Sequence, residues 1–311
     1  MRKNITYQRT KRVLFSSLGL LAMASLALAD DITSGHSGLE DMETSSITNV
    51  FSVNPGFEWL PNADFNTSRL GQVNVWRFNV PASYTLKTQP GDLRLGVFYE
   101  YSEYQFSKLE DLGGRDEGRK DFNTLAFNTL WKSMINDDWG YFLYGQVSLS
   151  AAKSTDLGNG LTGMGGGGVQ YVFSDKLRLG LGAAVATHTE EDPSVLPIIA
   201  LNWQINDRWT LTTLNGATIT YDVTGDKKFL LDLGAAYQRR EYAIEKNTSL
   251  YDRQYTLELG ATYNFTPNVG IRGYAGVATG RKFQVRHNDQ KIVDQDVDAA
   301  PIIGVRAMFT F

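Results

Sequence analysis

The sequence Ile-Gly-Val-Arg-Ala-Met-Phe-Thr-Phe occupies residues 303–311, and every second residue in it, from Ile303 to Phe311, is apolar. Apolar residues at every second position predict a β-strand with one face toward an apolar environment. The strand stops on an aromatic residue, and no residue follows it. The pattern predicts an all-β fold if the same period recurs along the rest of the chain.

Earlier segments repeat this alternation over greater lengths. Odd-numbered residues are mostly apolar, and even-numbered ones largely small or polar, in segments 139–149, 177–185, 229–237 and 255–265. These runs exceed the ~5 to 6 residues of a typical globular strand, and a tilted strand needs ~9 to 11 residues to cross a bilayer. The mean hydropathy is only −0.27. We therefore expect membrane-spanning strands that face lipid with apolar side chains and the lumen with polar ones.

Short and long connections alternate along the chain. Turn-favouring residues predict tight connections at 90–92, 136–138, 174–176, 206–208 and 266–268. Longer, charged connections are expected at 60–70, 108–120, 153–160, 190–194, 240–252 and 282–299. Short turns on one side and long loops on the other are typical of the periplasmic and extracellular ends of a bacterial barrel. We predict a transmembrane antiparallel up-and-down β-barrel.

The number of strands follows from this alternation. Asn215-Gly216 is a strong hairpin signal and predicts a short hairpin that joins 209–214 to 217–223, with 224–228 as the next turn. Counting this hairpin gives about fourteen strands, an even number as bacterial barrels have. Twelve strands are the alternative.

The first 29 residues read as an export signal. A basic segment precedes an apolar run at 13–28, and Ala27-Leu28-Ala29 offers the small residues that a signal peptidase recognises. We expect cleavage after Ala29, a polar extension at 30–49 and the barrel at 50–311. Export followed by membrane insertion predicts the bacterial outer membrane as the location.

Charge and cysteine content exclude some classes of function. Removal of the leader takes away five of the 30 basic residues and none of the 34 acidic ones, which leaves a net charge of −9. This sign argues against nucleic acid as a partner, which would call for a basic patch. The chain contains no cysteine. Stability must therefore come from burial or a closed hydrogen-bonded ladder, because disulfides cannot form.

Two features carry a resemblance to known proteins. The apolar alternation that ends on Phe309 and Phe311 resembles the signature that Gram-negative outer-membrane β-barrels present to their assembly machinery. Over most of its mature length the chain also resembles an uncharacterised family of bacterial outer-membrane β-barrels in which turns like Asn206-Asp207-Arg208-Trp209 recur. The resemblance implies outer-membrane lipid and the assembly machinery as partners. It implies no activity.

No cofactor or metal is expected. The glycines at 163–168 satisfy G-x-G-x-x-G, but a strand pattern at 169–173 follows them where nucleotide binding would require a helix. Asp294, Asp296 and Asp298 have the opening spacing of a calcium loop. The glycine and glutamate that an EF-hand needs later in the loop are absent.

The histidines offer one route to chemistry. His188 is followed by Glu190, Glu191 and Ser194, and His287 lies near Asp289 in another predicted outer loop. A histidine with carboxylates or a serine at the outer rim resembles the sites of outer-membrane hydrolases. Acid–base chemistry needs these groups within ~3 Å of one another, which spacing in the sequence cannot show. We expect ordinary exposed loop residues and no enzyme activity.

Charged residues on the lumen-facing side are the stronger candidates for a functional site. If odd-numbered positions face lipid, several charges point inward, and unpaired burial of a charge costs several kcal/mol. They must either line a water-filled passage or form ion pairs in a plugged lumen. The candidates for a lumen constriction are Arg94, Glu100, Arg178, Asp232, Glu258, Arg272 and Arg306.

Three functions follow from this pattern. The leading hypothesis is a narrow, porin-like channel through which small solutes diffuse passively. The first alternative is a closed barrel with a structural or surface-binding role, and the second is a hydrolase at the extracellular rim. A secreted β-sandwich is the rival fold, but the chain has too few remaining apolar residues to fill a packed interior.

Overall fold

The computed structural model describes residues 49–66, 71–107, 119–214 and 216–311. The expected signal peptide at 1–29 lies outside these residues, as do Asn215 and all of the polar extension at 30–49 except its last residue. One short 3-10 helix, η2 (Leu157–Gly160), is present among the strands. Within the described ranges no helix has the length and apolar character that crossing a bilayer requires.

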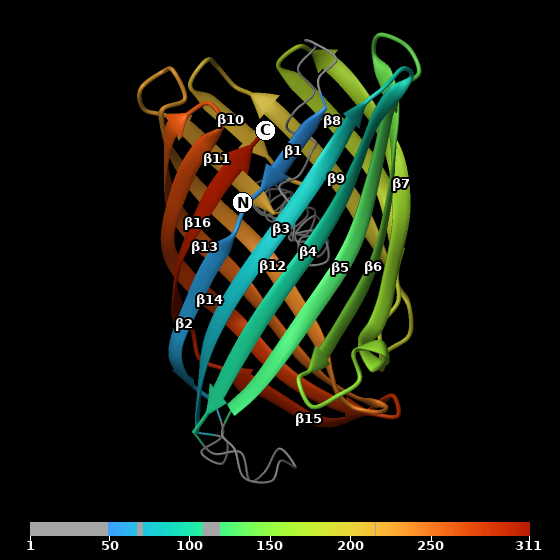
Figure 1. Cartoon of the computed structure of the whole chain (residues 1–311), viewed down its shortest axis with the longest axis vertical. Coiled ribbons are helices and arrows are strands. Elements are labelled where there is room, and N and C mark those ends of the chain that lie inside the picture. Colours follow the sequence, from blue (N-terminus) through green and yellow to red (C-terminus); the bar gives the residue numbers. More distant parts are fainter. Residues whose placement is uncertain (1–48, 67–70, 108–118, 215) are drawn as a thin grey trace, which may run out of the picture.

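The remaining elements of the described chain are strands (Figure 1). They are β1 (Val50–Val53), β2 (Gly56–Asp64), β3 (Gln72–Lys87), β4 (Gly91–Phe106), β5 (Arg119–Met134), β6 (Trp139–Ala152), β7 (Leu161–Ser174), β8 (Leu177–Ala186), β9 (Ser194–Gln204), β10 (Trp209–Thr212), β11 (Ala217–Asp222), β12 (Phe229–Glu245), β13 (Thr248–Thr266), β14 (Val269–His287), β15 (Gln290–Val297) and β16 (Ala300–Thr310).

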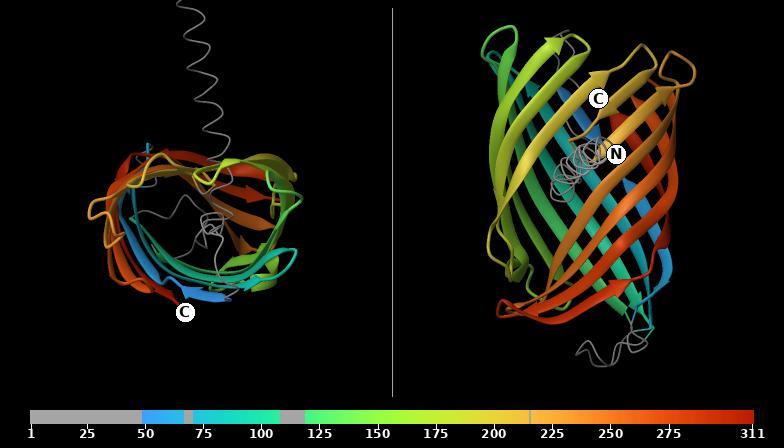
Figure 2. Two further views of the ribbon diagram at one scale, coloured as in Figure 1. Left: turned by 90° about the horizontal axis from the view of Figure 1, so that it is seen from above. Right: turned by 180° about the vertical axis from the view of Figure 1, so that it is seen from behind.

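Fourteen of these strands close into an antiparallel ring. Each strand from β2 to β14 pairs with the next, β14 also pairs with β16, and β16 pairs with β2. Figure 2 shows the ring closed when it is viewed along its axis. The short strands β1 and β15 are additional: β1 pairs with β16 and β3, and β15 pairs with the far end of β14. The predicted fourteen-stranded barrel is confirmed.

The two faces of the sheet carry different side chains, as the alternation predicts. Leu233, Leu259 and Val305 are exposed on the outer face. Asp232, beside Leu233, is buried on the inner face. Because exposed leucines and valines repeat around the ring, the outer surface has the apolar character of a lipid-facing wall.

Four tight turns lie within a residue of 136–138, 174–176, 206–208 and 266–268 as predicted, whereas the turn expected at 90–92 lies at 88–90 because Gly91 already begins β4. In two of the turns an asparagine side chain satisfies the backbone groups. Asn136 Oδ1 accepts hydrogen bonds from the backbone N–H groups of Asp138 and Trp139. Asn206 Oδ1 does the same for Arg208 and Trp209. These turns lie at the end of the barrel that carries the chain's C-terminus, and the long hairpins lie at the other. The convention for bacterial barrels makes them the periplasmic and extracellular ends.

Two of the expected long loops are wrong. The segments at 240–252 and 282–299 are mostly strand, and the connections within them are confined to 246–247, 288–289 and 298–299. Asn247, Asn288 and Asp289 adopt positive φ angles there, which allows the reversal. Charged residues in these strands form ion pairs, in the interior for Asp252 and Arg240 and at the surface for Lys282 and Asp294. The segments therefore lack the apolar alternation by which a strand is recognised.

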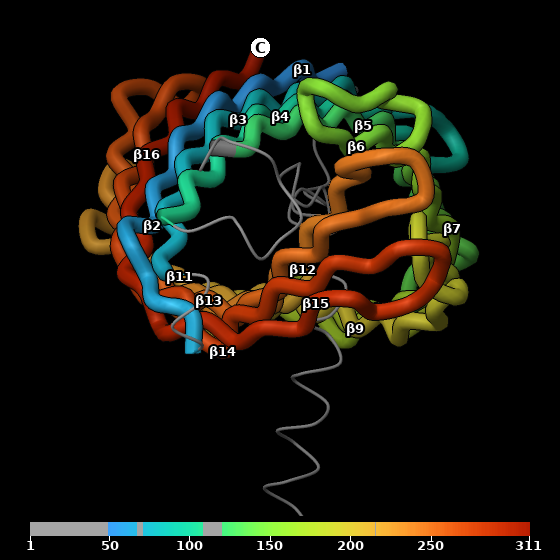
Figure 3. The backbone as a smooth tube through the Cα atoms, turned by 90° about the horizontal axis from the view of Figure 1, so that it is seen from below, coloured from blue at the N-terminus to red at the C-terminus, as the bar shows by residue number. Residues whose placement is uncertain are grey.

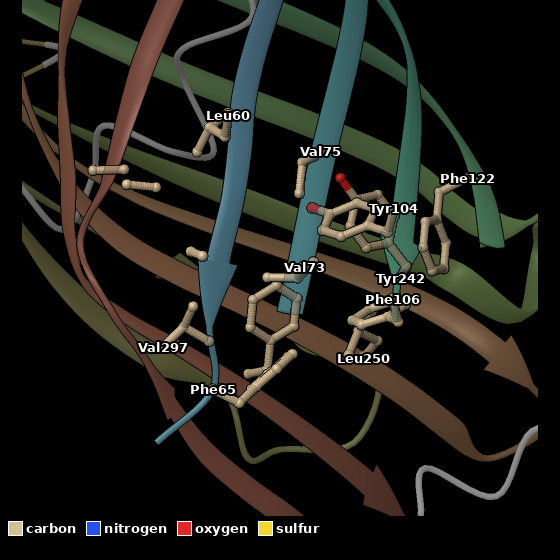
Figure 4. Packing of buried hydrophobic residues seen from close by; sticks show 14 of the residues in the cluster. Leu60, Phe65, Val73, Val75, Tyr104, Phe106, Phe122, Tyr242, Leu250 and Val297 are labelled. Atoms are coloured by element: carbon tan, nitrogen blue, oxygen red, sulfur yellow. The ribbon is translucent and has the colours of Figure 1, made fainter. Parts of the chain in front are cut away.

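These extended hairpins fold toward the barrel axis at the extracellular end. Ala243 of β12 pairs in parallel with Ala151 of β6, a strand from the opposite wall. Figure 3 shows the β12–β13 turn reaching across to β6. An aromatic and aliphatic cluster fills the space between these hairpins and strands β2 to β5 (Figure 4). Tyr242 and Phe122 stack at its centre with ring centroids 4.3 Å apart.

The short hairpin at β10 and β11 is confirmed, and it leaves an opening in the ladder. β9 pairs with β10 only at residues 202–204, and β11 reaches only Ala235 of β12. Among the described residues, no strand pairing joins 194–201 of β9 to 236–242 of β12. We call this interruption the wall gap.

A proline protects one edge of the wall gap. Thr213 bonds with the backbone of Ile199 and Leu201, so odd-numbered residues of β9 direct their backbone groups away from β8. Pro197 is also odd-numbered, so its backbone nitrogen lies on this edge, and proline has no N–H that would be left unpaired there. Prolines within sheets are confined to such edges, so the sequence is adapted to an open edge here.

Candidate functional site

None of the seven predicted lumen residues is exposed. Glu100 and Asp232 are buried, and the other five are partly buried. They do not form one ring. Asp232, Glu258 and Arg272 lie together, whereas Glu100 belongs to a separate network nearer the extracellular end.

The first group joins three neighbouring strands, β12, β13 and β14. Arg272 Nε donates to Asp232 Oδ2 at 3.1 Å, and Arg272 Nη2 lies 3.7 Å from Glu258 Oε2. Gly260 lies between them, since a Cβ there would come within 2.7 Å of both Asp232 and Arg272 side chains. The missing side chain makes room for the ion pair.

A second network is more deeply buried, and sequence reasoning missed it. Arg77 of β3 bonds to Glu58 of β2 at 2.7 Å and to Asp252 of β13 at 2.9 Å. Arg281 of β14 lies 3.5 Å from Asp252, and Tyr104 Oη donates to Asp252 at 2.9 Å. The arginine side chains and Asp252 are fully buried. The one available signal is the alternation of Arg77 with the apolar residues 76 and 78.

Glu100 forms a neighbouring set of contacts that reaches the aromatic cluster through Tyr242. Its Oε1 accepts from Arg240 Nε at 3.2 Å and from Ser102 Oγ at 3.0 Å. Tyr242 Oη lies 3.4 Å from the same oxygen. Paired charges and aromatic rings therefore pack on the inner side of the extracellular half of the barrel.

A smaller apolar cluster lies beside the wall gap. Phe142, Met164, Ala184, Ala186 and Ile198 form its buried part. Leu196 of β9 and Leu214, which follows β10, pack against it. This cluster places apolar side chains on the inner face at the interruption of the ladder.

His188 does not have the expected loop environment. Its side chain is only 5% exposed. Nδ1 lies 3.2 Å from Glu241 Oε2, and Nε2 lies 2.9 Å from Ser194 Oγ. His287 is exposed and contacts Thr248 and Asn288 instead. The structure brings His188 together with a serine and a carboxylate, and leaves His287 apart.

Glu241 is held rigidly at the extracellular end, outside the lipid-facing wall. Its Oε1 accepts hydrogen bonds from the backbone N–H and hydroxyl of Thr189 and from Tyr251 Oη at 3.0 Å. Burial alone would raise the pKa of Glu241, but the hydrogen bond from His188, the Arg239 charge and the Thr189 donors together lower it. The carboxylate therefore stays ionised.

The connection between β8 and β9, residues 187–193, is anchored by its acidic residues. Glu191 lies 2.8 Å from Arg239, 3.0 Å from Arg253 and 3.0 Å from Arg286. The backbone N–H of Asp289 donates to Glu190 at 3.0 Å. These bonds cross the outer end of the wall gap and attach the connection to β12, β13 and β14.

The acidic run at 294–298 does not form a calcium loop. Asp294 lies 3.4 Å from Lys282 and 2.9 Å from Lys291. Across the part of the chain that the structure covers, no three acidic, histidine or cysteine side chains are grouped to hold a metal ion.

Comparison with known families and sequences gives one match. A family model described as a domain of unknown function, DUF6268, matches residues 124–296, more than half of the chain. No curated protein matches the sequence.

Solved structures share the fold. An outer membrane channel of the COG4313 group from Pseudomonas putida F1 is 11% identical, with a TM-score of 0.51 over 89% of this chain and all of the other. A deletion mutant of the TodX monoaromatic hydrocarbon channel (10% identity, TM-score 0.49, 88% and 92% coverage) and a Pseudomonas aeruginosa FadL homologue (10%, 0.48, 84% and 90%) are more distant. At this identity the likeness shows an outer-membrane β-barrel fold and nothing finer.

Proposed function

This chain belongs to the DUF6268 family, whose description assigns no activity, and from that premise we propose that it is a passive outer-membrane channel for small, mainly apolar solutes. The wall gap carries the proposal. It interrupts the hydrogen-bonded ladder of an otherwise closed barrel, and an apolar cluster lies on its inner side.

The filled extracellular end shapes the route. Because the aromatic cluster and its buried ion pairs occupy the space between β2 to β5 and the long hairpins, a straight axial passage would have to displace them. Residues 194–198 of β9 face no such barrier on the edge away from β8, since the bonds of Thr213 begin only at Ile199. An apolar solute would pass between the lumen and the lipid through the wall gap.

The ion pair of Arg272 with Asp232 would define the polar side of the passage. These residues, with Glu258, lie on the inner face toward the periplasmic end, and we propose that they narrow the lumen there together with Arg94, Arg178 and Arg306. Where water remains in this part of the passage, opposed charges favour polar or charged solutes over apolar ones. A solute leaving the apolar cluster would meet them next.

The structural neighbours support this reading at the level of the fold. The COG4313 protein is described as an outer membrane channel. A barrel of fourteen strands also lies between the ~8-stranded barrels that side chains fill and the 16 to 18-stranded porins with aqueous channels.

Uptake of an apolar fluorescent probe, N-phenyl-1-naphthylamine, by Gram-negative cells that express the chain tests the proposal. Leu196→Trp would enlarge a side chain of the apolar cluster at the wall gap and should reduce uptake several-fold. Val195→Trp adds the same bulk one residue away on the exposed outer face and is the matched control. Equal uptake by wild type, both variants and cells without the protein would overturn the proposal.

The closed, structural barrel is the second candidate, and the filled extracellular end favours it. It predicts no uptake and no conductance in planar bilayers from protein that shows heat-modifiable gel migration. A conductance that changes in Arg272→Ala or Glu258→Ala would exclude it.

A further inference from the structure

The rim of the barrel holds a group of side chains that transport does not use. We propose that Ser194, His188 and Glu241 form a serine esterase site that cleaves esters with an apolar acyl chain. The three residues come from the start of β9, the β8–β9 connection and the outer part of β12. The inference does not rest on the proposed channel.

The hydrogen bonds give each residue a defined role. Glu241 accepts at 3.2 Å from Nδ1 of His188, which fixes the proton on that nitrogen. Nε2 of His188 is then free to accept the Ser194 hydroxyl at 2.9 Å. This is the order nucleophile, base and orienting carboxylate by which serine hydrolases are recognised, whatever their fold.

The surroundings hold this order in place. Thr189 and Tyr251 donate to Oε1 of Glu241, so that Oε2 is directed toward the histidine. Arg239 Nη2 lies 3.5 Å from the same Oε2, but at 2.8 Å from Glu191 it is bound more closely there. The His188 side chain is almost fully buried while Ser194 is partly exposed. The base is therefore shielded and the nucleophile accessible.

A donor for the developing oxyanion follows from the wall gap. Val195 has the same parity as Ile199 and Leu201, whose backbone groups point away from β8. Its N–H therefore lies on the free edge of β9, where no described strand pairs with it. The residue after the nucleophile supplies this donor in many hydrolases that act on acyl groups.

The apolar cluster indicates the class of substrate. Ser194 shares its parity along β9 with Leu196 and Ile198, which belong to the cluster or pack against it. An acyl chain bound at Ser194 would lie along these side chains. The leaving alcohol would point toward solvent at the extracellular rim.

The reaction balances with water as the co-reactant. Ser194 Oγ attacks the ester carbon while its proton moves to His188 Nε2, and the ester C–O bond breaks as that proton passes to the leaving alkoxide. A water molecule from the rim then gives a proton to Nε2, and its oxygen attacks the acyl carbon. The bond between the acyl carbon and Ser194 Oγ breaks as Nε2 returns the proton to Oγ, and the carboxylic acid leaves.

Refolded full-length barrel would be assayed with p-nitrophenyl octanoate and p-nitrophenyl acetate and labelled with a fluorophosphonate. We expect octanoate to be preferred, and Ser194 to carry the label in mass spectra. Ser194→Ala and His188→Gln should each lower the rate at least ~100-fold. Ser249→Ala, which removes a neighbouring serine bonded to Thr189, should not.

A second measurement separates catalysis from a structural role of these hydrogen bonds. The chain has no cysteine, so Ser194→Cys introduces a single thiol whose alkylation by iodoacetamide can be timed. Adding His188→Gln should slow the alkylation at least tenfold if the histidine acts as a base. Folded barrel with neither fluorophosphonate labelling nor a histidine-dependent thiol would overturn the proposal.

Discussion

At the scale of single residues, buried charges determine how the extracellular half of the barrel is built. Arg77 is fully buried and contacts carboxylates from two strands, one of them 175 residues away in sequence. Separation of this size explains why the network could not be predicted. The alternation of Arg77 with apolar neighbours places it on the inner face, but nothing in the sequence specifies its partners.

Replacing Arg77 with methionine should strongly destabilise the barrel. The change leaves Glu58 and Asp252 buried without the cation that lies nearest to each of them, and breaking a buried pair in this way costs ~3 to 5 kcal/mol. Urea unfolding of the refolded protein, followed by tryptophan fluorescence, would measure the loss. Lys176→Ala is the control, because its pair with Asp207 is exposed and should contribute little. Equal midpoints for the two variants would contradict the prediction.

Two glycines of β14 should respond differently to the same substitution. A Cβ at Gly276 would lie 2.0 Å from the carbonyl oxygen of Leu257, whereas a Cβ at Gly273 meets nothing within 4 Å. Gly276→Ala should therefore cost ~1 to 3 kcal/mol through a backbone shift, and Gly273→Ala should be close to neutral. Thermal or urea unfolding of both variants tests the difference, and a neutral Gly276→Ala would refute it.

At the scale of elements, apolar alternation predicts β6, β8, β16 and the lipid-facing parts of β12 and β13. The Asn215-Gly216 pair predicts the β10–β11 hairpin, whose Gly216 has a φ of +91°. The outer parts of β12 to β15 were expected as loops, because there both faces carry polar residues engaged in ion pairs. Alternation disappears from a sequence where a strand no longer separates lipid from lumen.

Acid should loosen the β14–β15 hairpin through Asp294. Burial would raise its pKa, but bonds from Lys291 and Gln284 and the Lys282 charge lower it to about 2. A lowered pKa stabilises the folded hairpin above the unfolded value of ~3.9, and this stabilisation is lost as the pH falls toward 2. Asp294→Asn should speed amide hydrogen exchange in the hairpin at pH 7 and have little effect near pH 2. A ratio of exchange rates that is the same at both values would contradict this.

At the scale of the whole molecule, the aromatic cluster packs the long hairpins of β12 to β15 against β2 to β5 at the extracellular end. Tyr242 is the central contact, since it stacks on Phe122 and bonds toward Glu100. The cluster joins residues that are far apart in the sequence, from β2 to β6 and from β12 to β16. The alternation of apolar residues along one strand carries no information about such contacts. Only the packed arrangement of β2 to β5 against β12 to β14 shows them.

Tyr242→Ala should weaken the packing of the aromatic cluster. Truncating a buried aromatic side chain costs ~3 to 5 kcal/mol, and we expect a larger or newly measurable conductance in planar bilayers from the variant. Tyr237→Ala on the same strand, whose ring lies 5.1 Å from that of Tyr255 outside the cluster, is the control. Unchanged conductance in folded Tyr242→Ala protein would mean that the cluster is not what blocks the axis.

The contact of β12 with β6 makes the extracellular half of the barrel mechanically unequal. On one side of this contact, the outer parts of β2 to β6 and β12 to β16 pack around the aromatic cluster. On the other side, the outer halves of β7, β8 and β9 are joined to the rest of the barrel through β6 and through the bonds of residues 187–193. Local opening should therefore begin in the outer halves of β7, β8 and β9. The backbone amides at 194–201 should exchange hydrogen faster than those around Arg77. Such local opening would widen the wall gap for bulky molecules while the aromatic cluster at the extracellular end stays packed.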